Sequence, residues 1–255
     1  MKVRVLGCSG GIGGWQARTT SLLVDRDVLI DAGTGVADLS LAELAAIDHV
    51  FITHSHLDHL ATLPLMIDSV ADLRDRPVTL HATEATLAAI RNHVFNWAIW
   101  PDFSEIAIRG RVALRYETII VGQGIPLGSG VITALPAEHT VPAVGYLLDS
   151  GSGSLCFSGD TTVNDPLWVL LNKVPNLCFL LIETAFPNSG EALARVSKHL
   201  CPRMLETELA KLCSSPEVFI THMKPGQDAA ILREIGAMAG RLRPAILRDG
   251  QVFEF

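Results

Sequence analysis

The stretch His54-Ser55-His56-Leu57-Asp58-His59 directly follows the apolar run Val50-Phe51-Ile52-Thr53. Three imidazoles and one carboxylate within six residues would compete for protons and desolvate one another without a shared partner. A divalent metal is such a partner, because neutral imidazole nitrogen and carboxylate oxygen are its natural ligands. Residues two apart in an extended segment point the same way. We therefore predict that the first two His bind one ion, and that the Asp and the last His face a second. A surface cluster of His is the alternative.

Three further candidate ligands come later in the chain, each after a strand-like apolar run. His139 and Asp160 follow two such runs, and His222 ends the pentapeptide Val-Phe-Ile-Thr-His at residues 218–222. The same pentapeptide occupies residues 50–54. This weak repeat is consistent with a fold of two similar α/β halves, each with a His at the carboxyl end of a buried strand. Asp160 is predicted to bridge two metals, because imidazoles leave the cations short of anionic charge. Capping of the next helix is the alternative.

The order His-x-His-x-Asp-His, a lone His, Gly-Asp and a late His resembles the ligand series of the metallo-β-lactamase-fold hydrolases. The resemblance runs nearly end to end, from Gly7 to His222. A finer resemblance is to the class II cyclic-nucleotide phosphodiesterases, although this chain has Thr62 where their signature usually has Gly or Ser. The segments that carry it are His54–His59, Phe95-Asn96, Trp100-Pro101, Glu183, Phe186-Pro187-Asn188, Ser197–Leu200 and Thr221–Pro225.

The resemblance implies the metallo-β-lactamase fold, a four-layer αβ/βα sandwich with two mixed β-sheets, as one domain over residues 1–255. The hydrophobic pattern mixes strands and helices throughout, as such a sandwich requires. The glycine-rich segment 7–14 does not match a dinucleotide-binding fingerprint, and we expect a loop at the active-site rim there. We predict strands at 2–7, 19–24, 27–31, 48–53, 77–81, 112–121, 131–136, 144–149, 154–158 and 177–182, a hairpin at 244–255, and helices at 36–46, 60–70, 84–97, 165–173, 203–213 and 227–239.

The resemblance also implies an activity, the hydrolysis of 3′,5′-cyclic nucleotides to nucleoside 5′-monophosphates by a dinuclear metal centre. Two divalent ions per chain are expected, with zinc as the first choice, although Mn or Fe suits the same ligands. The expected ligands are His54, His56 and His139 for one metal and Asp58, His59 and His222 for the other, with Asp160 and a hydroxide bridging them.

By resemblance to fold relatives that cleave phosphodiesters, His199 is the general acid and Glu183 orients it. These two residues and Asp58 make up the expected catalytic group. A His in the first turn of a helix is the alternative for His199. Asp31, in Leu-Ile-Asp-Ala-Gly, is expected to accept a hydrogen bond from a ligand His and so to fix its tautomer.

An aromatic cluster at residues 95–103 stands out in a chain with only 6% aromatic residues. It is either part of the core or a wall on which a nucleobase stacks. Lys198 and Lys224 are candidate phosphate contacts, with plain surface lysines as the alternative. The expected substrate contacts are Asn96, Trp100, Asn188 and Lys224. His49, His81 and His93 fall outside the motifs, and we expect structural roles for them.

The charge and hydrophobicity of the chain limit the kinds of partner that we expect it to bind. The net charge is −7, and the basic residues are scattered, whereas proteins that grip nucleic acid usually carry a basic face. We therefore expect a small cyclic nucleotide and no long nucleic acid. No apolar run reaches the roughly 18–20 residues that span a bilayer, so no membrane partner and a cytoplasmic location are expected. The five cysteines lack Cys-x-x-Cys spacing, which argues against disulfides. A homodimer is a fold-level expectation.

Three rival functions stay open. A nuclease that processes RNA 3′ ends would use the same fold, but it would need a basic patch or an extended arm. A lactone or thioester hydrolase would use the same metals without a phosphate site. A metal-binding sensor would need no catalytic residues, although degenerate members of such folds usually lose ligands.

Overall fold

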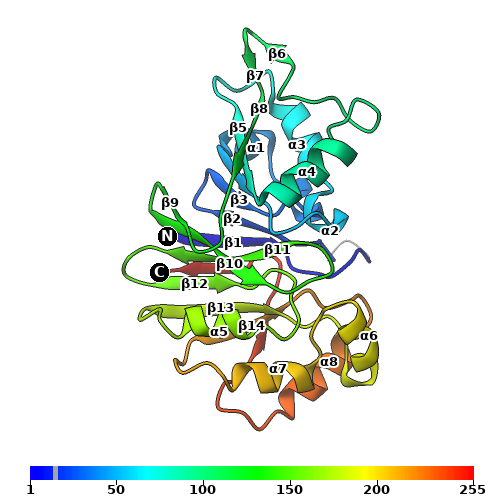
Figure 1. Ribbon diagram of the computed structural model, residues 1–255, viewed down its shortest axis with the longest axis vertical. Helices are drawn as coiled ribbons and strands as arrows, with labels where there is room; N and C mark the ends of the chain where they lie inside the picture. Colours follow the sequence, from blue (N-terminus) through cyan, green and yellow to red (C-terminus); the bar gives the residue numbers. More distant parts are fainter. Residues whose placement is uncertain (14–16) are drawn as a thin grey trace.

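The computed structural model describes residues 1–13 and 17–255, and within this part the chain forms two seven-stranded sheets. The sheets stack face to face, and helices cover both outer faces, which gives four layers (Figure 1). This is the αβ/βα sandwich that the sequence predicts. The loop predicted for the glycine-rich segment 7–14 includes residue 14, which lies outside the described residues.

The first sheet has the strand order β16-β1-β2-β3-β4-β5-β8. It is mixed, because β16, β1, β2 and β3 pair antiparallel while β3, β4, β5 and β8 pair parallel. Its strands are β1 (Lys2–Gly7), β2 (Ser21–Val24), β3 (Val28–Ile30), β4 (His49–Phe51), β5 (Val78–Ala82), β8 (Leu114–Thr118) and β16 (Val252–Glu254). The helices of this half are η1 (Thr34–Asp38), α1 (Leu41–Ala46), α2 (Leu57–Leu60), α3 (Leu63–Val70) and α4 (Glu84–His93).

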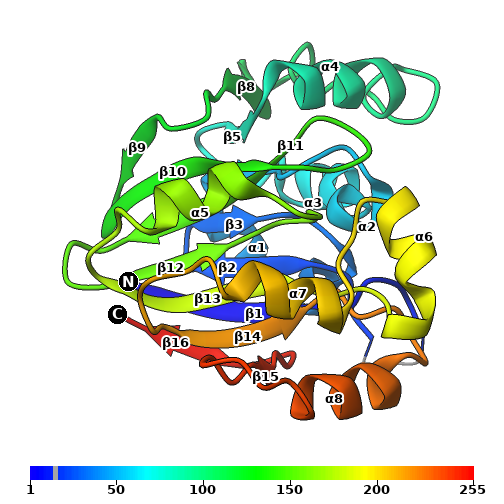
Figure 2. The same cartoon turned by 60° about the horizontal axis from the view of Figure 1, so that its bottom comes forward.

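The second sheet has the order β15-β14-β13-β12-β11-β10-β9, antiparallel from β9 to β12 and parallel from β12 to β15. Figure 2 shows α5 and α7 lying across it. Its strands are β9 (Gly124–Leu127), β10 (Gly130–Ala137), β11 (Ala143–Asp149), β12 (Ser154–Phe157), β13 (Leu177–Glu183), β14 (Glu217–Thr221) and β15 (Ala245–Ile246). The helices of this half are α5 (Asp165–Leu171), η2 (Asn188–Gly190), α6 (Glu191–Val196), α7 (Pro202–Leu209) and α8 (Asp228–Gly236). Outside both large sheets, β6 (Ala107–Ile108) pairs with β7 (Arg111–Val112) in a small hairpin.

The core follows from the alternation of side chains along the strands. Val50 and Ile52 pack beneath the helices of the first half, whereas Phe51 between them faces the second sheet. Phe51 meets Tyr146 edge to face at 5.6 Å between ring centroids. The Tyr146 hydroxyl donates a hydrogen bond to the Ile52 carbonyl oxygen at 2.8 Å, which ties the two sheets together close to the first donor motif.

The predicted hairpin at 244–255 is wrong. β15 pairs with β14 in the second sheet, whereas β16 pairs with β1 in the first. The chain between them crosses from one sheet to the other, with the Leu247 amide bonded to Ile220 and the Gly250 amide bonded to Val5. Local turn signals cannot distinguish a hairpin from such a crossover, because both need only a short polar turn.

Several predicted helices are shorter than expected. The predicted helix 36–46 is interrupted at Ser40, which begins α1 with a reciprocal capping box to Glu43. The predicted helix 84–97 ends at His93, and the predicted strand 112–121 divides between β7 and β8. The sequence analysis missed β9 and α6. No helix in the described part of the chain is long and apolar enough to cross a membrane.

Candidate active site

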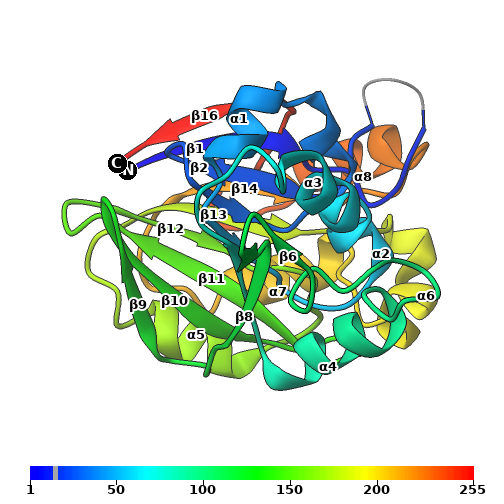
Figure 3. The same cartoon turned by 90° about the horizontal axis from the view of Figure 1, so that it is seen from above.

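The candidate metal ligands converge at one end of the sandwich. His54 follows β4, His139 follows β10, Asp160 follows β12 and His222 follows β14, while α2 carries two further donors. Figure 3 shows α2 and α6 at this end and both chain termini at the other. In the second sheet β10, β12 and β14 run in the same direction, so their carboxyl ends lie along one edge.

The first group of donors comprises His54, His56 and His139, which each offer one nitrogen within 4.8 Å of the others. His139 Nε2 lies 3.1 Å from His56 Nδ1. The second group comprises Asp58, His59 and His222, with the same 4.8 Å limit. The structure therefore brings together the residues of each expected ligand set.

Asp160 lies between the two groups. Its Oδ2 is 3.4 Å from His59 Nε2, 3.8 Å from His54 Nε2 and 3.9 Å from His139 Nε2. Its Oδ1 is 3.2 Å from His222 Nδ1. One carboxylate thus faces imidazoles from both groups, which is the position that a bridging ligand needs. The alternative role as a helix cap belongs instead to Asn164, whose side chain accepts from the Leu167 amide at the start of α5.

Three buried ring nitrogens show that this donor set fits divalent metals. His54 Nε2, His59 Nε2 and His222 Nδ1 have no hydrogen-bond partner among the residues that the structure describes. A buried polar atom without a partner costs roughly 1–3 kcal/mol. All three face the cluster around Asp160, where cations would supply the missing partners.

The electrostatics of the cluster favour metal binding. Burial lowers the pKa of His54 well below its ordinary value and that of His139 to about 4, so both imidazoles are neutral, the form that ligates a metal. Burial alone would raise the pKa of Asp160, but His222 and His59 hold it well below its usual range. Burial would also lower the pKa of His59, but Asp160 and Asp31 raise it strongly. These carboxylates therefore favour a positive charge beside the His59 ring, whether a proton or a metal carries it.

Hydrogen bonds outside the cluster orient its rings. Asp31 Oδ2 accepts from His59 Nδ1 at 2.7 Å, which leaves Nε2 facing Asp160. Asp31 is held in turn by Thr53, whose amide donates at 2.8 Å and whose hydroxyl donates at 2.8 Å. His139 Nδ1 donates to the Lys198 carbonyl oxygen at 3.1 Å. The sequence analysis missed Thr53, although its place before the His in both copies of the repeat was a signal.

The backbone is strained next to the cluster. Asp31, Lys198 and His222 have φ values of 55°, 52° and 63°, in the left-handed region that non-glycine residues rarely adopt. Such residues cost of order 1–3 kcal/mol each and persist only when their surroundings over-determine them. The His222 amide donates to the Cys8 carbonyl oxygen at 2.7 Å, and the Asp31 amide to Phe51 at 2.8 Å.

His199 and Glu183 form a buried pair beside the cluster. His199 Nδ1 donates to Glu183 Oε1 at 2.7 Å, and Glu183 also accepts from the Thr161 and Leu200 amides. Burial would lower the pKa of His199, but the Glu183 carboxylate raises it above its ordinary value. His199 lies between α6 and α7, so the alternative of a His in the first turn of a helix is wrong. Its ring centroid is 4.9 Å from that of His139.

Three of the expected substrate contacts have side chains that the fold uses. Asn96 Oδ1 accepts from the Ala98 and Ile99 amides and closes the turn after α4. Trp100 is partly buried against the core of the first half, to which the buried Phe95 and Phe103 also belong. Asn188 Oδ1 accepts from the Arg203 amide at the start of α7. The core alternative therefore describes Phe95, Trp100 and Phe103, whereas Trp97 of the same cluster is 61% exposed.

The fourth expected contact, Lys224, lies at the cluster, with its Nζ 3.4 Å from His222 Nε2. Phe186 also lies there, its ring edge-on to His199 at 5.8 Å, and the sequence analysis gave it no role although it stands in a quoted motif. Thr62 has ordinary helical dihedrals, and its hydroxyl donates to Ala32 at 2.9 Å, so this position does not need the usual Gly.

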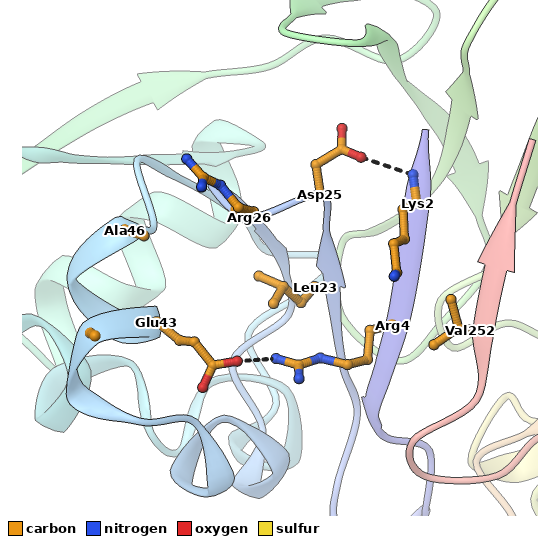
Figure 4. Close-up of a pocket in the computed structure, with 9 residues that line it drawn as sticks. Lys2, Arg4, Leu23, Asp25, Arg26, Glu43, Ala46 and Val252 are labelled. Atoms are coloured by element: carbon orange, nitrogen blue, oxygen red, sulfur yellow. Dashed lines mark hydrogen bonds and ion pairs between the residues drawn. The ribbon is translucent and has the colours of Figure 1, made fainter.

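The remaining His residues lie apart from these groups. His49 Nδ1 is 2.9 Å from His81 Nε2, and the His81 ring stacks on Phe51 at 4.3 Å. A separate cavity lies between β1, the turn after β2 and α1, where Arg4 Nη2 donates to Glu43 Oε1 at 2.6 Å (Figure 4). None of the residues lining this cavity belongs to the donor cluster.

Comparison with known proteins agrees with this geometry. The model of the "Beta-lactamase superfamily domain" matches residues 26–243, and the chain belongs to that family. It has the metallo-β-lactamase fold of metal-dependent hydrolases.

Individual relatives and one solved structure are similar to this chain. A "Probable 3′,5′-cyclic-nucleotide phosphodiesterase" of Yersinia pestis is 30% identical over 211 residues, covering 72% of this chain and 60% of that protein. A "Ribonuclease Z" of Haloarcula marismortui is 29% identical over 156 residues, covering 58% of this chain and 47% of that protein. The chain thus aligns with about half to three fifths of these relatives' lengths. Unliganded yeast PDE1 has the same fold, with a TM-score of 0.82 at 20% identity and coverage of 100% and 99%.

Proposed function

We propose that this protein is a metal-dependent phosphodiesterase that hydrolyses 3′,5′-cyclic nucleotides to nucleoside 5′-monophosphates. The observation that carries the proposal is the adjacency of two donor groups, joined by Asp160, to the buried His199–Glu183 pair. The name of the Yersinia pestis relative supports the substrate class.

The metals are assigned to the two donor groups. His54, His56 and His139 would hold one ion, Asp58, His59 and His222 would hold the other, and Asp160, which faces both groups, would be shared between them. When bound, two divalent cations supply Lewis-acid polarisation of the phosphoryl oxygens and activation of a water molecule. Zinc is the first choice because imidazole nitrogens dominate the donor set, and Mn or Fe is the alternative.

His199 supplies the proton for the leaving group. Glu183 holds Nδ1 and favours the protonated ring, so Nε2 is left to donate to the departing ribose 3′-oxygen. A sugar alkoxide is a poor leaving group, and general-acid assistance of this kind is worth roughly 10²–10⁴-fold. A thioester hydrolase has less need of such an acid, because a thiolate is a better leaving group than an alkoxide.

A ribonuclease acting on RNA 3′ ends is the second candidate, supported by the Haloarcula marismortui relative. Both candidates break a phosphodiester bond, so the cluster alone does not separate them. The net charge of −7 favours the small substrate, because RNA binding depends largely on neutralising phosphates with basic residues.

A substrate panel tests the proposal. The protein, loaded in turn with Zn, Mn and Fe, is assayed on 3′,5′-cyclic AMP and GMP, on cyclic dinucleotides and on a tRNA precursor. We expect the highest kcat/KM on a cyclic mononucleotide, with the 5′-monophosphate as product. Efficient RNA trimming without cyclic-nucleotide turnover would move the protein to the nuclease candidate. Metal binding without any turnover would make it a sensor.

A further inference from the structure

Two lysines flank the cluster, and the structure separates their roles. Lys198 precedes His199, and its Nζ forms an ion pair with the carboxylate of Glu138. Lys224 follows His222 by two residues, and its Nζ donates to the Gly10 carbonyl oxygen at 2.7 Å. The charge of Lys198 is thus already matched by a carboxylate, whereas among the residues that the structure describes the Lys224 ammonium contacts a neutral carbonyl and an imidazole.

The backbone that presents Lys224 is firmly held. The Lys224 amide donates to the Ala185 carbonyl oxygen at 3.1 Å, and the Gly10 amide donates to that of Met223 at 3.0 Å. Gly10 permits this close approach, because a Cβ there would come within 2.4 Å of the His222 carbonyl oxygen. Lys224 is partly buried, so its stem is constrained while its ammonium reaches the cluster.

The charge balance of the site calls for such a cation. Four carboxylates, those of Asp31, Asp58, Asp160 and Glu183, contact its imidazoles. Two divalent cations would balance these four charges, and the protonated His199 beside Glu183 gives its proton to the leaving group, so a further cation would stabilise the charge that the phosphate keeps. A lysine ammonium has three N–H donors, and at Lys224 one of them is used by Gly10.

We propose that Lys224 binds a non-bridging oxygen of the substrate phosphate, on the side of the cluster formed by Asp58, His59 and His222. Lys198 serves a different purpose, since its pair with Glu138 joins the two loops that carry His199 and His139. This inference rests on the proposed function, and it names the group that recognises the phosphate.

The test compares matched variants, Lys224→Gln and Lys198→Gln, with Lys224→Arg as the charge-preserving control. Inorganic phosphate is titrated calorimetrically into each metal-loaded protein at low ionic strength, after metal content has been measured. We expect Lys224→Gln to weaken phosphate binding roughly ten- to a hundredfold, the loss typical of a charge-assisted hydrogen bond. Lys198→Gln should weaken it by less than about threefold, and Lys224→Arg should recover most of the affinity. On cyclic nucleotide, Lys224→Gln should raise KM more than it lowers kcat.

Several results would overturn the inference. Equal weakening in both glutamine variants would show only a general field effect. If Lys224→Gln loses metal, the role of Lys224 is to hold the segment of residues 8–10 in place and not to bind phosphate. Absence of phosphate binding by the parent protein at millimolar concentration would also refute it. If Lys224→Gln hydrolyses cyclic nucleotides with the same kcat and KM as the parent protein, this inference fails and the proposed function stands. Phosphate binding that depends on Lys224, without turnover of any cyclic nucleotide, would end the proposed function and leave this inference standing.

Discussion

The pentapeptide Val-Phe-Ile-Thr-His occurs at residues 50–54 and 218–222, and each copy lies in the parallel part of one of the two large sheets. In both, Val and Ile pack beneath the helices of their own half, while Phe turns toward the space between the sheets. In both, the strand has parallel neighbours and delivers its His at the carboxyl edge. Identical local sequence therefore directs its side chains to the same faces twice.

The copies diverge at their last two residues. The Thr53 hydroxyl donates to the carboxylate of Asp31 at 2.8 Å, whereas the Thr221 hydroxyl donates to the Cys8 carbonyl oxygen at 3.2 Å. His222 has a left-handed φ of 63°, and His54 is not among the residues with positive φ. In the first half, α2 follows His54 and carries two more donors. In the second half, Lys224 follows His222 by two residues. The repeat positions an imidazole in each half, and the surroundings decide what chemistry accompanies it.

The largest expected effect comes from Asp160, whose carboxylate faces the donors of both groups. Asp160→Ala removes the carboxylate that faces both donor groups, so both metals should be lost or weakened, and turnover should fall at least ~100-fold. Asp31→Asn changes the direct hydrogen bond to His59 and should weaken the metal on that side roughly 10–100-fold. Metal content after dialysis measures both variants. Retention of two metals per chain in Asp160→Ala would remove it as a bridge.

The next effect separates ligation from proton transfer. His199→Ala should keep both metals and lower kcat roughly 10²–10⁴-fold, whereas His54→Ala should lose metal. The loss in His199→Ala should shrink on a nitrophenyl phosphodiester, whose leaving group needs little protonation. His199 also lies near enough to His139 and Asp160 to hold a metal with them. Metal loss in His199→Ala would therefore reassign it as a ligand.

A smaller effect concerns the stability of the two threonine anchors. Thr53→Val breaks hydrogen bonds to a buried carboxylate and should lower the free energy of unfolding by about 1.5–3 kcal/mol. Thr221→Val breaks one bond to a neutral carbonyl and should cost about 0.5–1.5 kcal/mol. Denaturant unfolding of the metal-free proteins gives both values. Equal losses would mean that the Asp31 carboxylate contributes nothing through Thr53.

The smallest effect concerns the two phenylalanines. Phe51 is fully buried, stacked on His81 and edge-on to Tyr146, whereas Phe219 is only partly buried. Phe51→Leu should therefore lower the free energy of unfolding by about 1–2 kcal/mol, and Phe219→Leu by less than about 1 kcal/mol. The same denaturation experiment reports both variants. A larger cost at Phe219 would contradict the burial difference between the copies.

Much of the fold and of the metal site could be predicted from the sequence. The apolar run of the repeated pentapeptide predicted a buried strand before His54 and before His222, because a short continuous apolar run is typical of a strand buried on both faces. The dense motif at residues 54–59 indicated metal binding, because no other environment readily accommodates so many donors. These signals are local, and they do not depend on which distant segments meet.

Only the tertiary structure decided the features that depend on contacts far apart in the sequence. It placed β15 and β16 in different sheets, and it committed Asn188 to the amide of Arg203 rather than leaving it free for substrate. It also distinguished two lysines that look alike in the sequence, pairing Lys198 with a carboxylate and bringing Lys224 against a carbonyl 214 positions away. The physical reason is that the charge environment of a side chain is set by its neighbours in space, and folding determines those neighbours.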